Sequence, residues 1–290
     1  MQYALHRDNC IRWMLAQEPN TIHAIVTDPP FGMKEFTAPE KLKLRSGSGG
    51  VWRTPPSFGG STRAPLPRFT ILSKDDQDAL SAFTLTFANA AMRVLVPGAH
   101  IFIAGNPLLS HLVYGPLLAT GFEKRGEIIR LVQTLRGGDR PKNAHVEYCD
   151  VSVMPRSQWE PWGLFRKPCE GRVQDNLRKW KTGGLRRISE DRPFSDVIRS
   201  SPTRREERAI APHPSLKPQR FMREIVRAAL PLGEGVLLDP FMGGGSTIAA
   251  AEAVGYRSIG VELDPAFFAI AQKAIPRLSL LDVPCVEVAT

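Results

Sequence analysis

The amino-acid sequence predicts an α/β protein with a mostly parallel sheet that is covered by helices on both faces. Segments with strand character alternate with segments of helix character through most of the chain, which is typical of parallel strands joined by crossover helices. One of these alternations carries three consecutive glycines between a strand and a helix. The chain has 290 residues, of which 42% are hydrophobic. That size and composition suit one large domain with insertions, or one domain with a small appendage.

The elements of the N-terminal half follow from hydrophobic runs and from the residues that interrupt them. Residues 22–27 are apolar and β-branched and stop at an Asp-Pro-Pro turn, so they are predicted to form a strand. Acids in the first turn favour a helix over 75–95, because they complement the helix dipole. The same reasoning predicts a strand at 99–104, a helix from Pro107 to about Thr120, and strands at 127–133 and 146–154.

The C-terminal part of the chain repeats the alternation. It is predicted to contain a helix at 218–230, a strand at 235–239, a helix at 246–254, a strand at 257–262 and a helix at 264–275. Two segments break the pattern. Residues 33–72 are rich in Gly, Ser and Pro and are expected to form a flexible loop. Residues 156–208 show no clear period and are expected to form a small separate module, so that 1–155 and 209–290 together make the main domain.

The excess positive charge is confined to two segments. The whole chain carries +9, residues 32–72 have seven Lys or Arg against two acids, and residues 156–208 have fourteen against eight. These segments also hold four of the five tryptophans, which are Trp52, Trp159, Trp162 and Trp180. Basic residues interleaved with aromatic ones suit a polyanion with stackable bases. A merely solvated basic surface is the alternative.

The four cysteines lie far apart and form no C-x-x-C pair; they are Cys10, Cys149, Cys169 and Cys285. With six scattered histidines, this spacing argues against a disulfide framework and against a metal site, and it fits a reducing cytoplasm. No apolar run is long enough to cross a bilayer. The first residues do not resemble a signal peptide, because charge and polarity begin at His6.

The segment Asp28-Pro29-Pro30-Phe31 places one carboxylate, exposed carbonyl groups and one flat ring at the end of an apolar strand. Two consecutive prolines fix two φ angles and remove two backbone donors, so this platform is stiff. Taken alone, such a segment is most simply a turn that ends a strand. The alternative is a rigid platform for a planar ligand, and the rest of the chain must decide between the two.

The glycine-rich turn at Gly243, Gly244 and Gly245 allows positive φ and a close approach of a ligand to the backbone. Glu262 ends the next strand, 23 residues after Asp239, where an acid commonly accepts hydrogen bonds from ribose hydroxyls. The turn lacks the lysine of a phosphate-binding P-loop and the third glycine of a dinucleotide fold. It therefore suits a nucleoside ligand such as S-adenosylmethionine, and a turn needed only for packing is the alternative.

Taken together, the two motifs resemble the amino-group DNA methyltransferases of the permuted β class, in which D/N/S-P-P-Y/F precedes a Gly-rich cofactor motif. Residues 239–247, DPFMGGGST, are similar to the family pattern D-P-F-x-G-S-G-T-T. HPSLKP, at 213–218, resembles the H-P-x-x-K-P segment that leads into the cofactor site. LHRDNC, at 5–10, resembles an N-terminal segment whose acid contacts the cofactor adenine, with Arg7 where glycine is more usual. MRVLVPGAHIFI, at 92–103, resembles a family strand.

The resemblance implies a Rossmann-like fold and a site-specific DNA methyltransferase that moves a methyl group from S-adenosylmethionine to the N6 amine of a flipped adenine. It implies the catalytic residues Asp28, Pro29, Pro30 and Phe31. It also implies a cofactor site made of Asp8, Asp28, His213, Lys217, Asp239, Phe241, Gly243, Gly244, Gly245, Ser246, Thr247, Glu262 and Leu263. Double-stranded DNA is the implied partner, residues 156–208 are the expected target-recognition region, and homodimers are common in the class.

Other functions stay open. Cytosine-N4 methylation uses the same geometry, although serine is commoner than aspartate at position 28 in such enzymes. RNA or a protein glutamine amide is a further substrate class, and a catalytically inactive nucleic-acid-binding protein would have lost Asp28 or the glycine turn. A nicotinamide-dependent oxidoreductase is disfavoured by the glycine spacing.

Overall fold

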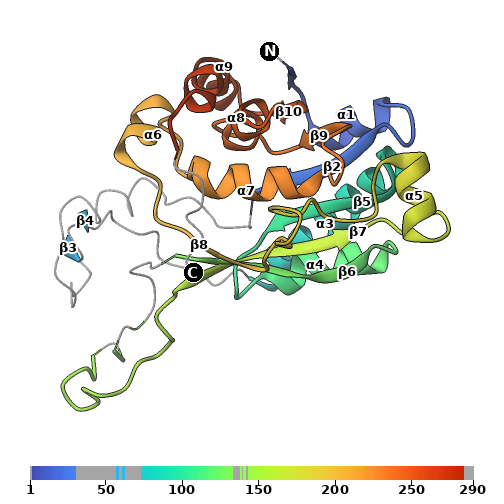
Figure 1. Cartoon of the computed structure of the whole chain (residues 1–290). Coiled ribbons are helices and arrows are strands. Elements are labelled where there is room, and N and C mark those ends of the chain that lie inside the picture. Colours follow the sequence, from blue (N-terminus) through green and yellow to red (C-terminus); the bar gives the residue numbers. More distant parts are fainter. Residues whose placement is uncertain are drawn as a thin grey trace.

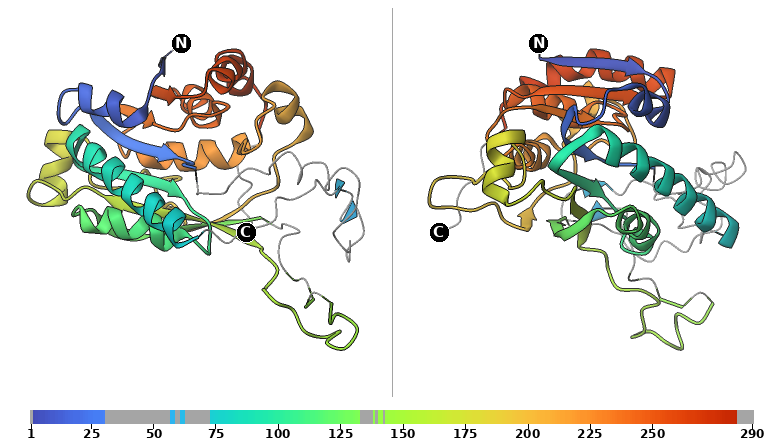
Figure 2. Two further views of the ribbon diagram at one scale, coloured as in Figure 1. Left: turned by 180° about the vertical axis from the view of Figure 1, so that it is seen from behind. Right: turned by 90° about the vertical axis from the view of Figure 1, so that its right-hand side faces the viewer.

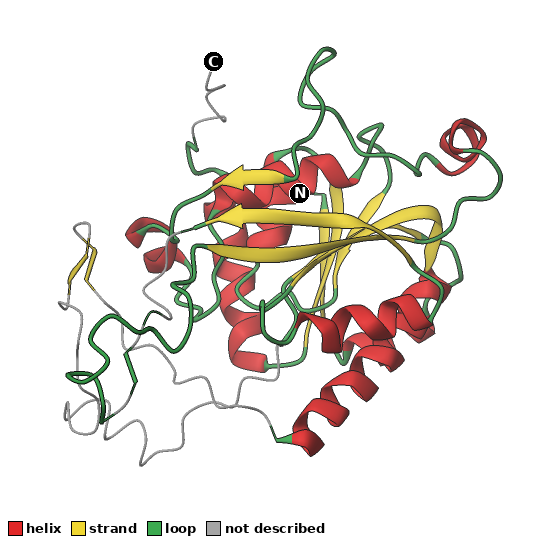
Figure 3. Cartoon of the chain, turned by 90° about the horizontal axis from the view of Figure 1, so that it is seen from below, coloured by secondary structure: helices red, strands yellow, loops and turns green. Residues whose placement is uncertain are grey.

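The computed structural model of the protein describes residues 2–30, 57–58, 61–62, 73–132, 138, 140–141 and 143–283. Eight strands form one twisted sheet, and helices lie on both of its faces (Figures 1 and 3). This architecture confirms the predicted α/β class. In the described part of the chain, no helix combines the length and the apolar character that crossing a membrane would require.

The strands of the sheet are β1 (Tyr3–Arg7), β2 (Ile22–Thr27), β5 (Leu95–Ala104), β6 (Glu123–Leu131), β7 (Trp159–Arg166), β8 (Val197–Arg199), β9 (Val236–Asp239) and β10 (Arg257–Glu262). Their spatial order is β1-β10-β9-β2-β5-β7-β6-β8. Neighbouring strands are parallel except where β7 pairs with β5 and β6. The carboxyl ends of seven strands and the amino end of β7 therefore share one edge of the sheet, termed here the carboxyl edge.

Helices cover the two faces of the sheet in two layers (Figure 2). One layer consists of α1 (Cys10–Ala16), α3 (Lys74–Val94) and α4 (Ser110–Ala119). The other consists of α7 (Gln219–Ala229), α8 (Ser246–Ala253) and α9 (Pro265–Ser279). The shorter helices α5 (Val173–Trp180) and α6 (Arg205–Ile210) lie in the connections, and β3 (Ser57–Phe58) pairs with β4 (Ser61–Thr62) away from the main sheet.

The period-2 alternation of side chains gives the sheet two apolar faces. In β2, Ile25 packs among residues of α1 and α3, whereas Ala24 and Val26 pack with residues of α7 and α8. All three side chains have no exposed surface. A strand that is buried on both faces reads as a continuous apolar run, which is why the sequence predicts β2 correctly.

The segment 156–208 differs from its prediction. It does not form a separate module, because β7 lies inside the main sheet between β5 and β6, and β8 extends the same sheet. The signal for β7 is weak because Pro161 and Gly163 are typical breakers of a strand. Trp162 and Phe165 are nevertheless fully buried and fill the core on the two sides of β7.

Residues 146–154, which the sequence predicts as a strand, form turns and an exposed loop that projects from the sheet (Figure 1). The apolar side chains of this loop, among them Val146, Val151 and Val153, are exposed. The strand that follows β6 in the sheet is instead β7. Apart from β3 and β4, residues 33–72 lie outside the described part of the chain. The flexible loop predicted for this segment therefore concerns residues outside the described part.

Candidate active site

The carboxyl edge brings together the two motifs that the sequence analysis singles out. Asp28 directly follows β2, Asp239 ends the neighbouring strand β9, and Glu262 ends β10, the next strand along. Pro29 is buried beside Asp28, and Pro30 is exposed. Adjacent parallel strands thus place three acids in a row. Phe31, the ring expected to stack on the target base, lies outside the described residues.

Asp28 forms a buried ion pair with Lys217. The distance between Lys217 Nζ and Asp28 Oδ2 is 2.5 Å, and the two side chains are 11% and 14% exposed, respectively. The other carboxylate oxygen, Asp28 Oδ1, is buried and has no hydrogen-bond partner among the described residues. A buried oxygen without a donor is costly. Asp28 Oδ1 is therefore an acceptor that a ligand with an N–H group can satisfy.

Two further charged residues, which the sequence analysis does not identify, extend this ion pair. Glu160 Oε1 lies 3.8 Å from Lys217 Nζ and accepts a hydrogen bond of 2.8 Å from Trp162 Nε1. Arg130 donates to Glu160 Oε2 over 3.1 Å, and its side chain is 5% exposed. No motif marks these residues in the sequence, because they meet only through the pairing of β6 with β7.

Burial and the neighbouring opposite charge shift the pKa values of Asp28 and Lys217 in opposite directions. Burial raises the pKa of Asp28, and the neighbouring Glu160 raises it further, whereas Lys217 lowers it. Burial alone would lower the pKa of Lys217, but Asp28 and Glu160 outweigh burial and raise it. Lys217 therefore remains an ammonium group, and it supports the ionised form of Asp28.

Asp239 lies beneath the glycine turn and joins β9 to β2. Its Oδ1 accepts hydrogen bonds from Thr27 Oγ1 over 2.6 Å and from the backbone N–H of Phe241 over 3.1 Å. Burial raises the pKa of Asp239 to about 6, although hydrogen bonds from Thr247 and Thr27 oppose the shift. The side chain is enclosed by protein, so its direct role in the structure is to hold the start of the turn.

Asp239→Asn is expected to become more stable relative to the wild type as the pH rises from 5 to 8. The asparagine oxygen can accept the same hydrogen bonds but carries no charge. The folded pKa of about 6 lies above the ordinary value near 3.9, so the folded wild type binds an extra proton between these two pH values. The wild type loses about 3 kcal/mol in all as the pH rises from below 4 to above 6, and about 1.4 kcal/mol of this loss falls between pH 5 and 8. Thermal unfolding of both proteins at pH 5 and 8 measures this, and a difference that does not change with pH would contradict it.

The glycine turn has no room for side chains. Gly243 and Gly245 have φ values of +52° and +86°. A Cβ atom on Gly244 would lie 2.8 Å from the Cβ of His213, and one on Gly245 would lie 2.5 Å from Ile275 Cγ1. His213 thus packs on the turn, and its ring meets that of Phe267 at a centroid distance of 4.3 Å. Glycine is therefore required at these positions by the packing of His213 and Ile275 against the turn.

Gly245→Ala is expected to lower the free energy of unfolding by about 1–3 kcal/mol and to weaken S-adenosylmethionine binding. Gly255→Ala is the matched control, because Gly255 has a φ of +77° but open space where its Cβ would lie. Both variants carry the same backbone strain, and only the first also collides with Ile275. Equal losses of thermal stability and of cofactor affinity in the two variants would show that the collision is unimportant.

Glu262 is held by backbone donors at the end of β10. Its Oε2 accepts from Gly243 N–H and its Oε1 from Asp264 N–H, each over 2.8 Å. Each oxygen keeps a further lone pair, so the carboxylate can still accept from hydroxyl groups. Leu263 follows and is 66% exposed.

Asp8 lies beside Glu262, since its backbone N–H donates to the carbonyl of Glu262 over 3.1 Å. Its side chain pairs with exposed Arg12, and that hydrogen bond, supported by one from Asn9, lowers the pKa of Asp8. The carboxylate therefore stays ionised next to the glycine turn.

The remaining predicted cofactor residues hold the turn in place. Ser246 Oγ accepts from Lys217 N–H over 3.2 Å, which links the HPSLKP segment to the start of α8. Thr247 is buried in the first turn of that helix. Phe241 packs against Phe83 and Phe87 of α3, with ring centroids 6.0 and 5.5 Å away. A glycine turn that opens a helix, a fixed acid at the next strand and a second acid beside it fit an adenosine-containing ligand.

The chain is similar in sequence to known proteins. A family model described as DNA methylase matches residues 22–273. The type II methyltransferase M.HindIII of Haemophilus influenzae is 24% identical over 289 residues, which cover 88% of this chain and 89% of that protein. The type II methyltransferase M2.DpnII of Streptococcus pneumoniae is 30% identical over 91 residues. That shorter match covers 31% of this chain and 34% of the relative's length.

Solved structures share the fold. A DNA modification methylase of Thermus thermophilus, TTHA0409, in complex with S-adenosyl-L-methionine, superposes with a TM-score of 0.58 at 20% identity and covers 97% of both chains. The cytosine-N4-specific PvuII DNA methyltransferase gives a TM-score of 0.60 at 12% identity and covers 97% of this chain and 87% of its own. The sheet is thus the Rossmann-like sheet of these methyltransferases. With a family model that spans both motifs and most of the sheet, the chain belongs to the N6/N4 DNA methylase family.

Proposed function

We propose that the protein transfers a methyl group from S-adenosylmethionine to the exocyclic N6 amine of adenine in double-stranded DNA. The observation that carries this proposal is the buried Oδ1 of Asp28 at the end of β2, which lacks a partner among the described residues. Membership of the N6/N4 DNA methylase family supplies the reaction class, and the carboxyl edge supplies an acceptor of the type that an amino group needs.

An exocyclic base amine is a poor nucleophile because its lone pair is delocalised into the ring. Asp28 Oδ1 and the carbonyl of Pro29 would accept its two hydrogens, which would draw the nitrogen toward tetrahedral geometry. When bound, S-adenosylmethionine supplies an electrophilic methyl group, and the nitrogen forms its new N–C bond as the S–C bond breaks. Rigid positioning by the two prolines and the charge of Asp28 favour the transition state. The base must leave the duplex to reach this site.

Lys217 controls the charge of the acceptor. Its ammonium opposes the rise in the pKa of Asp28 that burial causes, and it contacts only Oδ2, so that Oδ1 would be left to the amine. Glu160, fixed by Trp162 and Arg130, lies 3.8 Å away and provides a second anionic neighbour for Lys217 Nζ. The positive charge produced on the amine nitrogen during methyl transfer would thus develop beside the carboxylate of Asp28.

The glycine turn and the acids around it are proposed to hold the cofactor. Glu262 would accept hydrogen bonds from the ribose hydroxyls, and Asp8 would contact the adenine. The backbone of Gly243–Gly245 would lie against the ligand, close to Phe241 and Leu263. His213 and Lys217 would act mainly by fixing the turn and Asp28, as their contacts in the structure indicate.

Adenine is preferred over cytosine because Asp28 stands where serine is commoner in cytosine-N4 enzymes. Cytosine-N4 methylation is the second candidate, since the PvuII cytosine-N4 enzyme shares the fold. The geometry of the acceptor serves either amine.

Transfer of labelled methyl groups tests the function. Unmethylated genomic DNA, total RNA and a protein extract would each be incubated with the protein and methyl-labelled S-adenosylmethionine. Label in DNA, which disappears with Asp28→Ala, is expected. Label in RNA or protein alone would overturn the assignment of the substrate, and binding of NAD instead of S-adenosylmethionine would overturn the reaction class.

A further inference from the structure

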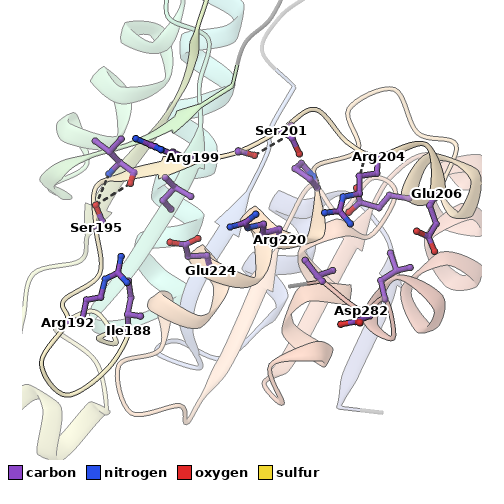
Figure 4. Close-up of a pocket in the computed structure, with 17 residues that line it drawn as sticks. Ile188, Arg192, Ser195, Arg199, Ser201, Arg204, Glu206, Arg220, Glu224 and Asp282 are labelled. Atoms are coloured by element: carbon purple, nitrogen blue, oxygen red, sulfur yellow. Dashed lines mark hydrogen bonds between the residues drawn. The ribbon is translucent and has the colours of Figure 1, made fainter. Parts of the chain in front are cut away.

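A cavity of about 600 Å³ lies between β8, the start of α6 and the first turns of α7 (Figure 4). None of the described residues that the sequence analysis assigns to catalysis or to the cofactor lines it. Its volume is in the range of sites for small ligands. The segment that forms one wall, from Ile188 to Ser201, belongs to the basic part of the chain whose function the catalytic edge does not explain.

Four arginines line this cavity, which are Arg192, Arg199, Arg204 and Arg220. The described ion pairs nearest to it join Arg130 to Glu160 and Lys217 to Asp28, and none of the four arginines takes part in an ion pair between described residues. A guanidinium group presents several donors in a planar fork that matches a phosphate. Several guanidinium groups around one cavity, none of them held in a described ion pair, therefore indicate a site for an anion.

Acidic residues also line the cavity, but they are not distributed evenly among the four arginines. Glu207 is buried and already accepts from the backbone N–H groups of Arg204 and Gln219, over 2.8 and 2.6 Å. Glu224 has a buried carboxylate oxygen without a described hydrogen-bond partner. Burial raises the pKa of Glu224, whereas the nearby charges of Arg220 and Arg192 lower it.

Figure 4 shows Glu206 and Asp282 together with Arg204 at one end of the cavity. The other end, with Arg192, Arg199 and Arg220, faces Glu224 as its one labelled acid. This second end is therefore the more positive one, and an anion is expected there.

A chain of polar contacts links the cavity to the proposed catalytic carboxylate through Arg130, Glu160 and Lys217. Ser200 and Ser201 line the cavity, and Arg130 donates to Ser200 Oγ and to the carbonyl of Ser201, each over 3.0 Å. Arg130 also donates to Glu160, the residue beside Lys217. On the other wall, Pro218 follows Lys217 directly. The cavity and Asp28 are thus connected through shared neighbours, as a site for the backbone of a strand whose base reaches Asp28 requires.

The geometry points to a binding site for a backbone phosphate of the DNA strand that carries the target base, with Arg199 and Arg220 as the principal donors. This inference rests on the proposed function. No aromatic ring is among the described residues that line the cavity, so they offer no stacking platform for a free nucleoside phosphate. A DNA backbone and a free nucleoside phosphate both present a phosphate group to the arginines, and the experiment below distinguishes these two ligands.

The test uses the full chain with Arg199→Gln, Arg220→Gln and the control Arg178→Gln. The control substitution removes the same formal charge from a side chain that is 75% exposed and pairs with Asp175 on α5. Helix α5 lies away from the carboxyl edge, because its Asn176 donates to the carbonyl of Pro97 near the start of β5. Binding of a labelled, unmethylated duplex is measured over a range of salt concentrations, together with S-adenosylmethionine binding, label transfer and the thermal unfolding midpoint.

Each cavity variant is expected to weaken DNA binding about fivefold at 0.1 M salt and to reduce the slope of log Kd against log salt by about 0.9. The affinity for S-adenosylmethionine and the unfolding midpoint should stay near the wild-type values. Arg178→Gln should change neither the DNA affinity nor the slope. Arg220→Lys should restore the slope and only part of the affinity, because lysine lacks the bidentate fork.

Other outcomes separate the inference from the function on which it rests. DNA binding and label transfer that match the wild type in both cavity variants would overturn the phosphate site and leave the methyltransferase standing. Stabilisation of the wild type, but not of Arg220→Gln, by deoxyadenosine monophosphate, with unchanged DNA affinity, would also overturn it in favour of a small-molecule site. A wild-type protein that neither binds nor methylates DNA would overturn the proposed function itself.

Discussion

Replacement of Asp28 by alanine is expected to lower the rate of methyl transfer to DNA by about 10³-fold. The substitution removes Oδ1, the buried oxygen proposed to accept a hydrogen from the target amine. It also leaves the buried ammonium of Lys217 without its nearest counter-ion. Single-turnover transfer of labelled methyl groups to DNA measures the loss, and a rate within tenfold of the wild type would remove Asp28 from the mechanism.

Asparagine at position 28 is the matched control for charge. It keeps an acceptor oxygen and the shape of the side chain but loses the negative charge. An intermediate rate, above that of alanine and below that of aspartate, would show that both the acceptor and its charge contribute. S-adenosylmethionine binding by equilibrium dialysis should stay within a fewfold of the wild type in both variants, so that the loss is assigned to the transfer step.

Lys217→Met is expected to lower activity at pH 7 by about 10²-fold and to move the rising limb of the pH–rate profile upward. Lys217 lowers the pKa of Asp28, while burial and Glu160 raise it. Without the ammonium, the pKa of Asp28 rises further, and the carboxyl is protonated at a higher pH. Activity that requires the ionised form is then present only above this raised pKa and is lost as the pH falls through it.

Two further variants separate the charge of Lys217 from its packing. Lys217→Arg keeps a cation and should return the profile toward that of the wild type. Glu160→Gln removes the neighbouring acid that raises the pKa of Asp28, so it should shift the profile in the opposite direction, toward lower pH. A pH profile that is identical in Lys217→Met and in the wild type would contradict the role of the ammonium.

The parts of the fold that follow from local pattern could be predicted from the sequence. The buried run of β2 and the acidic first turn of α3 were recognisable within a few residues of their observed bounds. β7 could not be recognised in this way, because Pro161 and Gly163 hide a strand whose Trp162 and Phe165 are fully buried. Its place in the sheet depends on pairing with β5 and β6, and no local pattern encodes it.

The residues of the candidate site also fall into two groups, those that a local sequence motif marks and those that meet only in the folded protein. Prolines and glycines in the sequence mark the strand ends that carry Asp28, Glu262 and the glycine turn. These residues could therefore be identified from the sequence. Arg130 and Glu160 come from two strands that meet only in the folded sheet. Lys217 was recognisable from its segment, but its ion pair with Asp28, 189 positions away, was not.

Identification of the methylated nucleoside tests the central claim most directly. DNA from a reaction with S-adenosylmethionine would be digested to nucleosides and analysed by mass spectrometry, with Asp28→Ala in parallel. N6-methyldeoxyadenosine is expected with the wild type and none with the variant. N4-methyldeoxycytidine in its place would contradict the assignment of adenine, and a methylated nucleoside formed equally well by Asp28→Ala would contradict the catalytic site itself.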